Sequence, residues 1–472
     1  MRADPQPRLH AAHALLPEGW VRDVLLAWNT AGTLTTVSPD TPAPTDAPRA
    51  AGVLLPGVPN LHSHAFQRAF AGLAEYRGER IDVSTETRTD ASADSFWTWR
   101  DLMYRFALAI SPDQLEAVAT QLYVEMLQAG YTAVCEFHYL HHDPQGRPYA
   151  DPAEMALRLL AAARQAGIGI TLLPVLYQHA CFGATPPRAQ QRRFVTGTDA
   201  LLDIAARLRA HGAHVGIAPH SLRAVGPRAL HEVVAGLHAL DPSAPVHLHI
   251  AEQQREVDDC LAWCGRRPVE WLLANAAVDA RWCLVHATHL SDAERRALAA
   301  SGAVAGLCPS TEANLGDGVF DAAAYLAAGG AWGIGSDSHA SVDAAGELRW
   351  LEYTQRLARQ QRHVLASPAH RQVADRLWLG AVGGGARASG RALGGLAVGQ
   401  QADFIVLDDS GTLAGLDPPQ ALANHVFALA GHGAVRDVWV AGVQRVHEGR
   451  HALERSACAR FVAARRELLD EV

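Results

Sequence analysis

The sequence predicts an α/β protein: a closed (β/α)8 TIM-type barrel with a small β-sandwich domain built from both chain termini. Eight short apolar segments alternate with helix-like segments over about 280 residues, which is the pattern a parallel barrel requires. An open doubly wound sheet is the structural alternative. No Gly-x-Gly-x-x-Gly opens a helix after the first strand, which counts against a dinucleotide-binding sheet. The predicted strands are the run that ends at His62 and His64, then residues 131–139, 167–175, 214–219, 245–250, 282–286, 303–308 and 331–336.

The two chain ends carry short β-like segments. Residues 20–28 and 33–37 flank a turn composition at residues 29–32, which favours a hairpin. Residues 403–408, 435–440 and 444–447 are too few for a sheet of their own, so we expect them to pair with the hairpin. The predicted domains are residues 1–53 for the first part of the sandwich, 54–395 for the barrel, and 396–472 for the second part with a terminal helix.

Two further segments give local predictions. Ser111, Pro112 and Gln114 form an N-terminal capping signature, and Gly130 can end the helix that they begin. Residues 380–399 are rich in glycine, and we predict that they cross the surface.

Composition excludes several classes of protein. The 472 residues carry 41 Lys and Arg against 49 Asp and Glu, a net charge of −8, so neither a nucleic-acid partner nor an anionic membrane is indicated. Seven scattered cysteines are typical of reduced thiols, and Cys260 and Cys264 read as one helix face. No signal peptide is visible at the start, and the longest apolar stretch, residues 157–177, is interrupted by charge. We therefore predict a cytoplasmic protein.

Several predicted strands end in groups that could bind a metal. Side chains alternate along a strand, so His62 and His64 point the same way. His249 follows on strand five and is preferred over His247 because it lies nearer the barrel mouth. Strand six gives His286, and strand eight is followed by Asp337. Three imidazoles and one carboxylate make a plausible mononuclear zinc site that keeps a position open to water. The expected cofactor is one Zn²⁺ per chain, with iron or manganese left open.

These motifs resemble the amidohydrolase superfamily, in its zinc-dependent aminohydrolase branch. The resemblance rests on His62-Ser63-His64, His249-x-x-Glu252, His286 and Asp337, and residues 395–404 are similar to that superfamily's return into its β domain. Pro219-His220-Ser221 stands at the end of strand four, where a lysine would bridge two metals, so one metal is favoured. Family likeness also implies a homodimer.

Within this branch the likeness is greatest to the iminohydrolases that act on N-formimino-L-glutamate in histidine degradation. It is carried by residues 60–68, 96–100, 136–139 and 220–223. The resemblance implies that the substrate is surrounded by Gln67, Arg100, Tyr139, His220 and Arg223. A dicarboxylate substrate independently needs cationic forks, which arginine supplies. Alternatively, Arg100 belongs to a solvated lid helix and Arg223 to the surface.

The expected catalytic residues are Glu252, His286 and Asp337. His286 and Asp337 would orient and deprotonate the attacking water, and Glu252 would carry protons to the departing nitrogen, leaving N-formyl-L-glutamate and ammonia. One alternative is a zinc deaminase of a purine or pterin-like heterocycle, against which two arginines count. Another is a non-catalytic zinc-binding protein on the same scaffold, against which the spare acid beside the metal counts.

Overall fold

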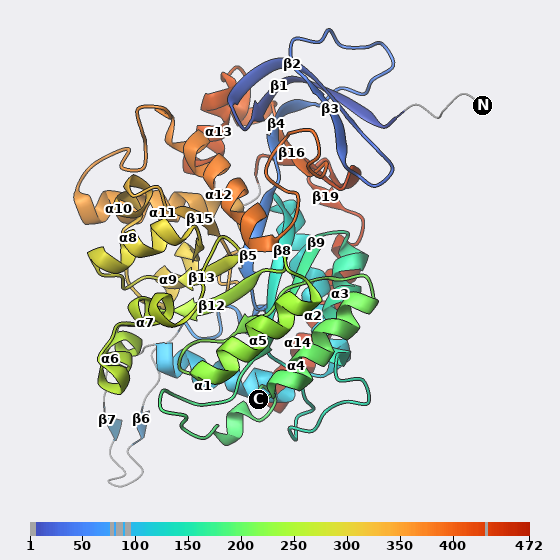
Figure 1. Cartoon of the computed structure of the whole chain (residues 1–472). Coiled ribbons are helices and arrows are strands. Elements are labelled where there is room, and N and C mark those ends of the chain that lie inside the picture. The colour runs from blue at the N-terminus through green and yellow to red at the C-terminus, as the bar shows by residue number, and fades with distance from the viewer. Residues whose placement is uncertain (1–5, 76–79, 82–87, 90–95, 430–432) are drawn as a thin grey trace.

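The barrel strands form two parallel sheets that face each other. The structure is a computed structural model that describes residues 6–75, 80–81, 88–89, 96–429 and 433–472 (Figure 1). The first sheet holds β5 (Val58–Ser63), β8 (Tyr131–His138), β9 (Gly169–Leu176), β10 (His214–Val215) and β11 (Ala218–Pro219). The second holds β12 (Val246–Ile250), β13 (Trp282–His286), β14 (Val304–Leu307) and β15 (Ala331–Ile334). Every strand expected in the barrel region is present.

Backbone hydrogen bonds join the two sheets at both seams. Beside β11, the amide of His249 donates to the carbonyl of His220 at 3.0 Å. Between β15 and β5, the amide of Asp337 donates to the carbonyl of His62 at 3.0 Å, and the amide of His64 donates to the carbonyl of Asp337 at 3.2 Å. The strands therefore run round a closed ring, and the predicted (β/α)8 class is confirmed.

A glycine permits the close approach at the second seam. A Cβ on Gly335 would lie 2.7 Å from the Cβ of His62 and 2.8 Å from its backbone nitrogen, closer than side chains tolerate. Any larger residue at this position would push β15 away from β5. This seam is also where the first and last groups of the predicted metal site meet.

Helices cover the outside of the ring. The helix predicted to begin after Ser111 and to end near Gly130 is present as α2. The outer helices are α2 (Pro112–Gln128), α3 (Glu154–Ala166), α4 (Thr198–Ala210), α5 (Pro227–Leu240), α6 (Gln254–Cys264), α7 (Pro268–Asn275), α8 (Asp292–Ser301), α9 (Pro309–Leu315), α10 (Ala322–Ala327) and α11 (Ala344–Arg359). α1 (Phe96–Ala109) and the 3-10 turns η1 (Ala65–Phe70) and η2 (Ala189–Gln191) belong to the loops of the barrel. A short hairpin, β6 (Arg80–Ile81) and β7 (Arg88–Thr89), lies between η1 and α1.

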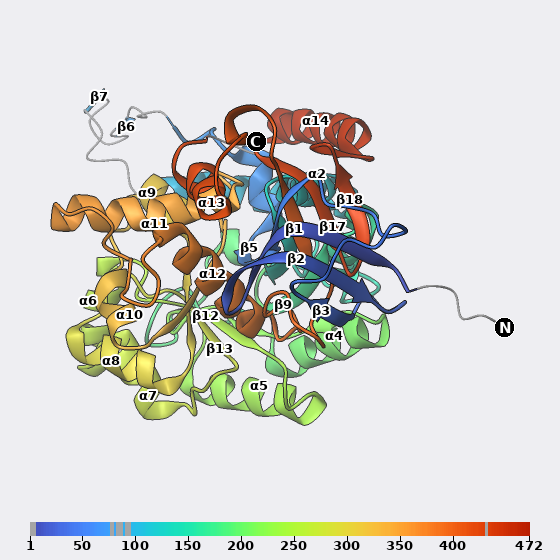
Figure 2. The ribbon, with the colours of Figure 1, turned by 90° about the horizontal axis from the view of Figure 1, so that it is seen from above.

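The prediction that the glycine-rich segment crosses the surface is wrong for its first half. Residues 380–389 belong to α12 (Val373–Ser389), which lies across the amino-terminal ends of the strands (Figure 2). Side chains inside the barrel donate to its last turn, Thr171 to the carbonyl of Ser389 at 2.9 Å and His247 to that of Ala388 at 2.8 Å. A Cβ on Gly384 would clash with the carbonyl oxygen of Trp332. The glycines therefore allow a helix to close the barrel floor, because helix and strand backbones nearly touch there.

Both chain ends build one small β domain, as expected. Its strands are hydrogen-bonded into a single eight-stranded sheet, in which β4 pairs with β1 in parallel and with β16 antiparallel. Across the sheet the order is β19 (Arg450–His451), β18 (Val443–His447), β17 (Val435–Val440), β16 (Phe404–Asp408), β4 (Gly52–Pro56), β1 (Arg8–Leu16), β2 (Gly19–Trp28) and β3 (Leu34–Ser38). The sequence did not predict β1. The domain limits stay a prediction, and β4 lies across the limit at residue 53.

The apolar core of this domain and the remaining C-terminal elements complete the fold. Leu26, Leu54 and Phe404, from three different strands, are buried together in one cluster. The C-terminal part also contains η3 (Gly411–Leu413), α13 (Pro418–Phe427) and α14 (Glu454–Glu471), of which α14 packs against α2. All seven cysteines are free thiols. Among the described residues, no helix combines the length and the apolar character needed to span a bilayer.

We expect Ser111→Ala to lower the free energy of unfolding by about 1 kcal/mol. The Ser111 hydroxyl accepts a hydrogen bond from the Gln114 amide at 3.2 Å, and the Gln114 side chain accepts one from the Ser111 amide at 2.9 Å, so both bonds of a capping box are present. Equilibrium denaturation in urea measures the change. Ser456→Ala, on the exposed face of α14, is the control and should change stability by less than about 0.5 kcal/mol.

Candidate metal centre and active site

Four predicted metal ligands converge at the carboxyl-terminal ends of the barrel strands. Their ligand atoms all lie within 4.8 Å of one another, and all four side chains are buried; they are His62, His64, His249 and Asp337. The Nε2 atom of His62 lies 3.2 Å from that of His64 and 3.0 Å from that of His249. Asp337 Oδ1 lies 3.4 Å from His62 Nε2 and 3.3 Å from His64 Nε2. Ligand atoms around a tetrahedral zinc ion lie about 3.3 to 3.4 Å apart, so the spacing fits.

Backbone hydrogen bonds aim two of the imidazoles at the common point. His64 donates its Nδ1 proton to the carbonyl of Phe137 at 2.8 Å, and His249 donates its Nδ1 proton to the carbonyl of His220 at 3.2 Å. This tautomer leaves a lone pair on each Nε2. Lone pairs that face one another at about 3 Å repel unless a cation lies between them. The donor set therefore suits a divalent metal ion.

The charge states also suit a metal ion. Burial lowers the pKa of His62 to about 3 and lowers the pKa values of His64 and His249. Burial alone would raise the pKa of Asp337, but hydrogen bonding to His62 and the nearby His286 hold it below its usual range. The three histidines are thus neutral and the carboxylate is ionised at neutral pH, which is the form in which each binds a metal.

Beside the four ligands, two further groups face the same point. His286 Nε2 lies 3.9 Å from Asp337 Oδ2 and 3.7 Å from Glu252 Oε1. Burial lowers the pKa of His286, but Glu252, Glu312 and Asp337 outweigh it and raise that pKa to about 10. Burial raises the pKa of Glu252 despite His286 and Arg223 nearby. His286 therefore keeps a proton, and Glu252 is suited to exchange one.

The backbone adopts left-handed conformations where these groups leave their strands. His286 has φ +69°, Ala287 +50° and Asp337 +47°, and none of them is glycine. Such conformations are uncommon for residues that carry a Cβ, and they cluster at functional sites. Here they turn the chain sharply at the strand ends, so that His286 and Asp337 face one another across the barrel mouth.

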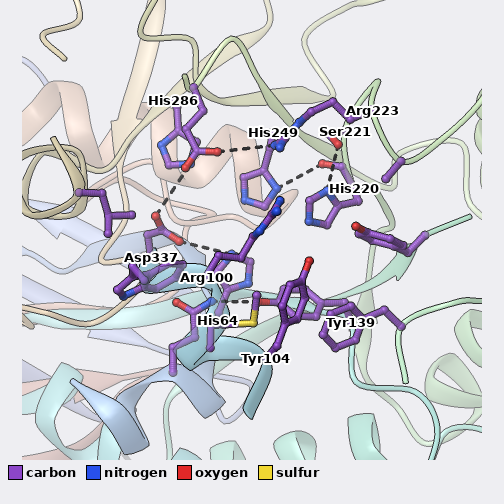
Figure 3. Close-up of a pocket in the computed structure, with 18 of the residues that line it drawn as sticks. His64, Arg100, Tyr104, Tyr139, His220, Ser221, Arg223, His249, His286 and Asp337 are labelled. Carbon is purple, nitrogen blue, oxygen red and sulfur yellow. Dashed lines mark hydrogen bonds and ion pairs between the residues drawn. The ribbon is translucent and has the colours of Figure 1, made fainter. Parts of the chain in front are cut away.

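All five predicted substrate residues line one cavity together with three of the metal ligands. Figure 3 labels four of the five: Arg100, Tyr139, His220 and Arg223. The cavity holds about 720 Å³ of empty space, part of it open to solvent. Gln67 donates to the Tyr139 hydroxyl at 2.9 Å, and His220 Nδ1 lies 3.0 Å from the Ser221 hydroxyl. Arg223 Nη2 lies 3.8 Å from Glu252 Oε2. The surface position considered for Arg223 is therefore wrong, since its side chain is only 12% exposed.

Arg100 lies on α1 and also lines the cavity (Figure 3). Its guanidinium carbon is 5.6 Å from the centre of the Tyr104 ring, one helical turn further on. Arg100 therefore contributes to the cavity wall and is not a fully solvated lid residue.

Sequence reasoning missed several residues of the site. Tyr104 stands four residues after Arg100 on the predicted helix, so helical spacing could have placed it on the same face. Tyr177 follows strand three but looked like part of an apolar run. Glu312 was missed because it lies in α9, beyond the end of strand seven, yet its Oε1 atom lies 3.4 Å from His286 Nδ1.

The chain belongs to the amidohydrolase family, which matches residues 53–445. It is 53% identical to the formimidoylglutamate deiminase of Pseudomonas aeruginosa over 466 residues, which is 98% of this chain and 99% of that protein. The residue motifs that suggested this family are thus supported by a match over nearly the whole chain.

Solved structures share the fold. The crystal structure of an amidohydrolase from Brucella melitensis has a TM-score of 0.90 and 48% identity, covering 98% of this chain and all of that one. An adenosine deaminase from Xanthomonas campestris, solved with bound zinc, has a TM-score of 0.77 and 24% identity, covering 99% of each chain. Members of the family bind a metal, and His62, His64, His249 and Asp337 are the candidate ligands in this chain.

We expect His249→Ala to reduce the bound metal from about one ion per chain to a small fraction of that, since three protein ligands then remain. Elemental analysis of purified protein measures it. His247→Gln is the matched control. His247 lies two residues earlier on β12, and its Nε2 atom is hydrogen-bonded to the carbonyl of Ala388 in the barrel floor. We expect this substitution to leave the metal content unchanged. Equal metal in the wild type and in His249→Ala would rule out His249 as a ligand.

Proposed function

We propose that the protein hydrolyses the formimino group of N-formimino-L-glutamate to N-formyl-L-glutamate and ammonia. The observation that carries the proposal is a cavity lined both by metal ligands, His64, His249 and Asp337, and by two arginines, Arg100 and Arg223. The 53% identity to a formimidoylglutamate deiminase supports it. We further propose one Zn²⁺ per chain, because the set of three histidines and one aspartate has the composition and spacing that zinc prefers.

We propose that three side chains, Asp337, His286 and Glu252, carry out the proton transfers. A metal ion at this site lowers the pKa of water and polarises the group it contacts. Asp337 is ionised and is placed to accept a proton from the attacking water, and His286 donates a hydrogen bond from Nε2 to the same oxygen. Glu252, 3.7 Å from His286, delivers protons to the departing nitrogen. The oxygen of water adds to the formimino carbon, and both protons of that water pass to the terminal nitrogen. The bond between this carbon and the terminal nitrogen then breaks, which releases ammonia and leaves the N-formyl group.

Recognition of the substrate falls to the polar wall of the cavity. We propose that Arg100 and Arg223 bind its two carboxylates, since guanidinium groups form paired hydrogen bonds to carboxylate oxygens. Gln67, Tyr139 and His220 supply neutral donors and acceptors around the same space. Burial lowers the pKa of His220 well below its usual value, so its imidazole would contact the substrate as a neutral group.

The two alternative functions are less well supported. A purine or pterin-like heterocycle offers no pair of carboxylates, so two arginines in the wall would have no partner on it. A non-catalytic metal site needs no acid beside its ligands, whereas Glu252 and His286 lie next to them. Cytoplasmic location, assembly as a homodimer and a place in histidine degradation stay predictions.

Ammonia release from a panel of compounds tests the proposed function. We expect turnover of N-formimino-L-glutamate, and a kcat/KM at least about 100-fold lower for N-formimino-glycine, because this compound lacks one of the two carboxylates that the arginines would bind. N-guanidino-L-glutamate tests the reacting group and adenosine tests the heterocycle alternative. Turnover of adenosine alone would overturn the proposal, and release of ammonia from none of the four would favour a non-catalytic protein.

We expect Glu252→Gln to lower kcat by at least about 1,000-fold, because glutamine keeps the shape but cannot exchange the proton. Steady-state kinetics of ammonia release measure it. Metal content is the control and should stay as in the wild type, since Glu252 is not among the four ligands. A variant that binds metal and keeps near-wild-type kcat would remove Glu252 from this role.

A further inference from the structure

We infer that Glu312 is a positioning residue for His286: its carboxylate fixes the orientation of that imidazole. The inference rests on the proposed function, which places His286 Nε2 at the reacting oxygen. Glu312 is not one of the four candidate metal ligands and is not among the residues that line the cavity with the substrate residues. It would act on the reaction only through His286.

The two nitrogens of His286 face different partners. Nδ1 lies 3.4 Å from Glu312 Oε1, whereas Nε2 faces the centre, 3.7 Å from Glu252 and 3.9 Å from Asp337. A carboxylate can only accept at Nδ1, so the Nδ1 proton is fixed. A ring flip would move Nδ1 and its proton to the cavity side and break this bond. The same logic governs a catalytic histidine held by a buried carboxylate in hydrolytic triads.

Glu312 is itself held rigidly, as a positioning residue must be. Its Oε1 atom also accepts a hydrogen bond from the backbone amide of Cys308 at 2.9 Å, at the point where β14 ends and α9 begins. Its backbone carbonyl accepts from the amide of Asp317 at 2.9 Å. The residue is 5% exposed, so water competes little for the carboxylate. Its position is therefore set by the strand end that also shapes the barrel mouth.

The hydrogen bond that anchors His286 differs in kind from those of His64 and His249. His64 and His249 donate Nδ1 to backbone carbonyls, of Phe137 and His220, which no substitution of those residues removes. His286 alone among these three is anchored by a side-chain carboxylate. The anchor of His286 is thus open to test by mutation.

Kinetics of three variants test the inference. We expect Glu312→Ala to lower kcat 10- to 100-fold, with KM within about twofold and metal content unchanged, because His286 is misplaced while substrate and metal residues stay. Glu312→Gln keeps an acceptor oxygen in the same place, so its kcat should lie between Glu312→Ala and the wild type.

Glu347→Gln is the matched control for disturbance of α9. Glu347 lies on α11, and its carboxylate accepts a hydrogen bond from the amide of Ser310 in α9 at 2.8 Å. Among the described residues, Glu347 forms no hydrogen bond or ion pair with His286. Burial raises the pKa of Glu347 to about 8, so glutamine resembles its protonated form at neutral pH. We expect kcat to stay within about twofold of the wild type. A loss of kcat as large as that of Glu312→Ala would show that any disturbance of α9 lowers activity, and it would overturn the inference.

The remaining outcomes separate this inference from the proposed function. If the wild type turns over N-formimino-L-glutamate and Glu312→Ala has an unchanged kcat, the function stands and the inference falls. If the wild type releases no ammonia from any compound, the function falls, and crystal structures of the metal-loaded wild type and Glu312→Ala decide the inference. A His286 ring that turns or takes two positions in the variant supports it, and an unmoved ring overturns it.

Discussion

The whole active site depends on the hydrogen bonds that join the first and last barrel strands. At this seam the amide of Asp337 donates to the carbonyl of His62, and its carbonyl accepts from the amide of His64. Ligands 275 positions apart in sequence, His62 and Asp337, are therefore fixed beside each other by the backbone itself. Gly335 is what lets the strands approach so closely. A barrel that failed to close here would keep most of its core but would have no metal site, because Asp337 would lose its place beside His62 and His64.

The two ends of the barrel have different roles: one is closed by a helix, and the other contains the active-site cavity. At the amino-terminal ends of the strands, α12 fills the floor, and its last carbonyls accept hydrogen bonds from side chains inside the ring. At the carboxyl-terminal ends, buried imidazoles and carboxylates face a cavity. Leaving so many polar groups without water costs stability, and it is tolerated because hydrogen bonds orient each group and a cation can neutralise the cluster. The rigid floor supports this arrangement.

Much of the fold and the proposed ligand set could be read from periodicity and from strand ends. Parallel strands bring their carboxyl ends to one face, so His62, His64, His249 and Asp337 could be grouped without coordinates. The glycine-rich part of α12 could not be predicted, because glycine usually signals a loop and its use here depends on the strand backbones beneath it. Glu312 was missed for a similar reason: nothing local marks a residue beyond a strand end as the partner of His286.

The sequence by itself determined the order of the barrel strands, the identity of the groups at their ends and the family to which the chain belongs, since these follow from local patterns and motifs. Only the tertiary structure decided how the barrel closes, which nitrogen of each imidazole faces the centre, and that Arg100 and Arg223 share one cavity. The physical reason is that orientation and charge state depend on burial and on hydrogen-bond partners, and those come from segments far away along the chain.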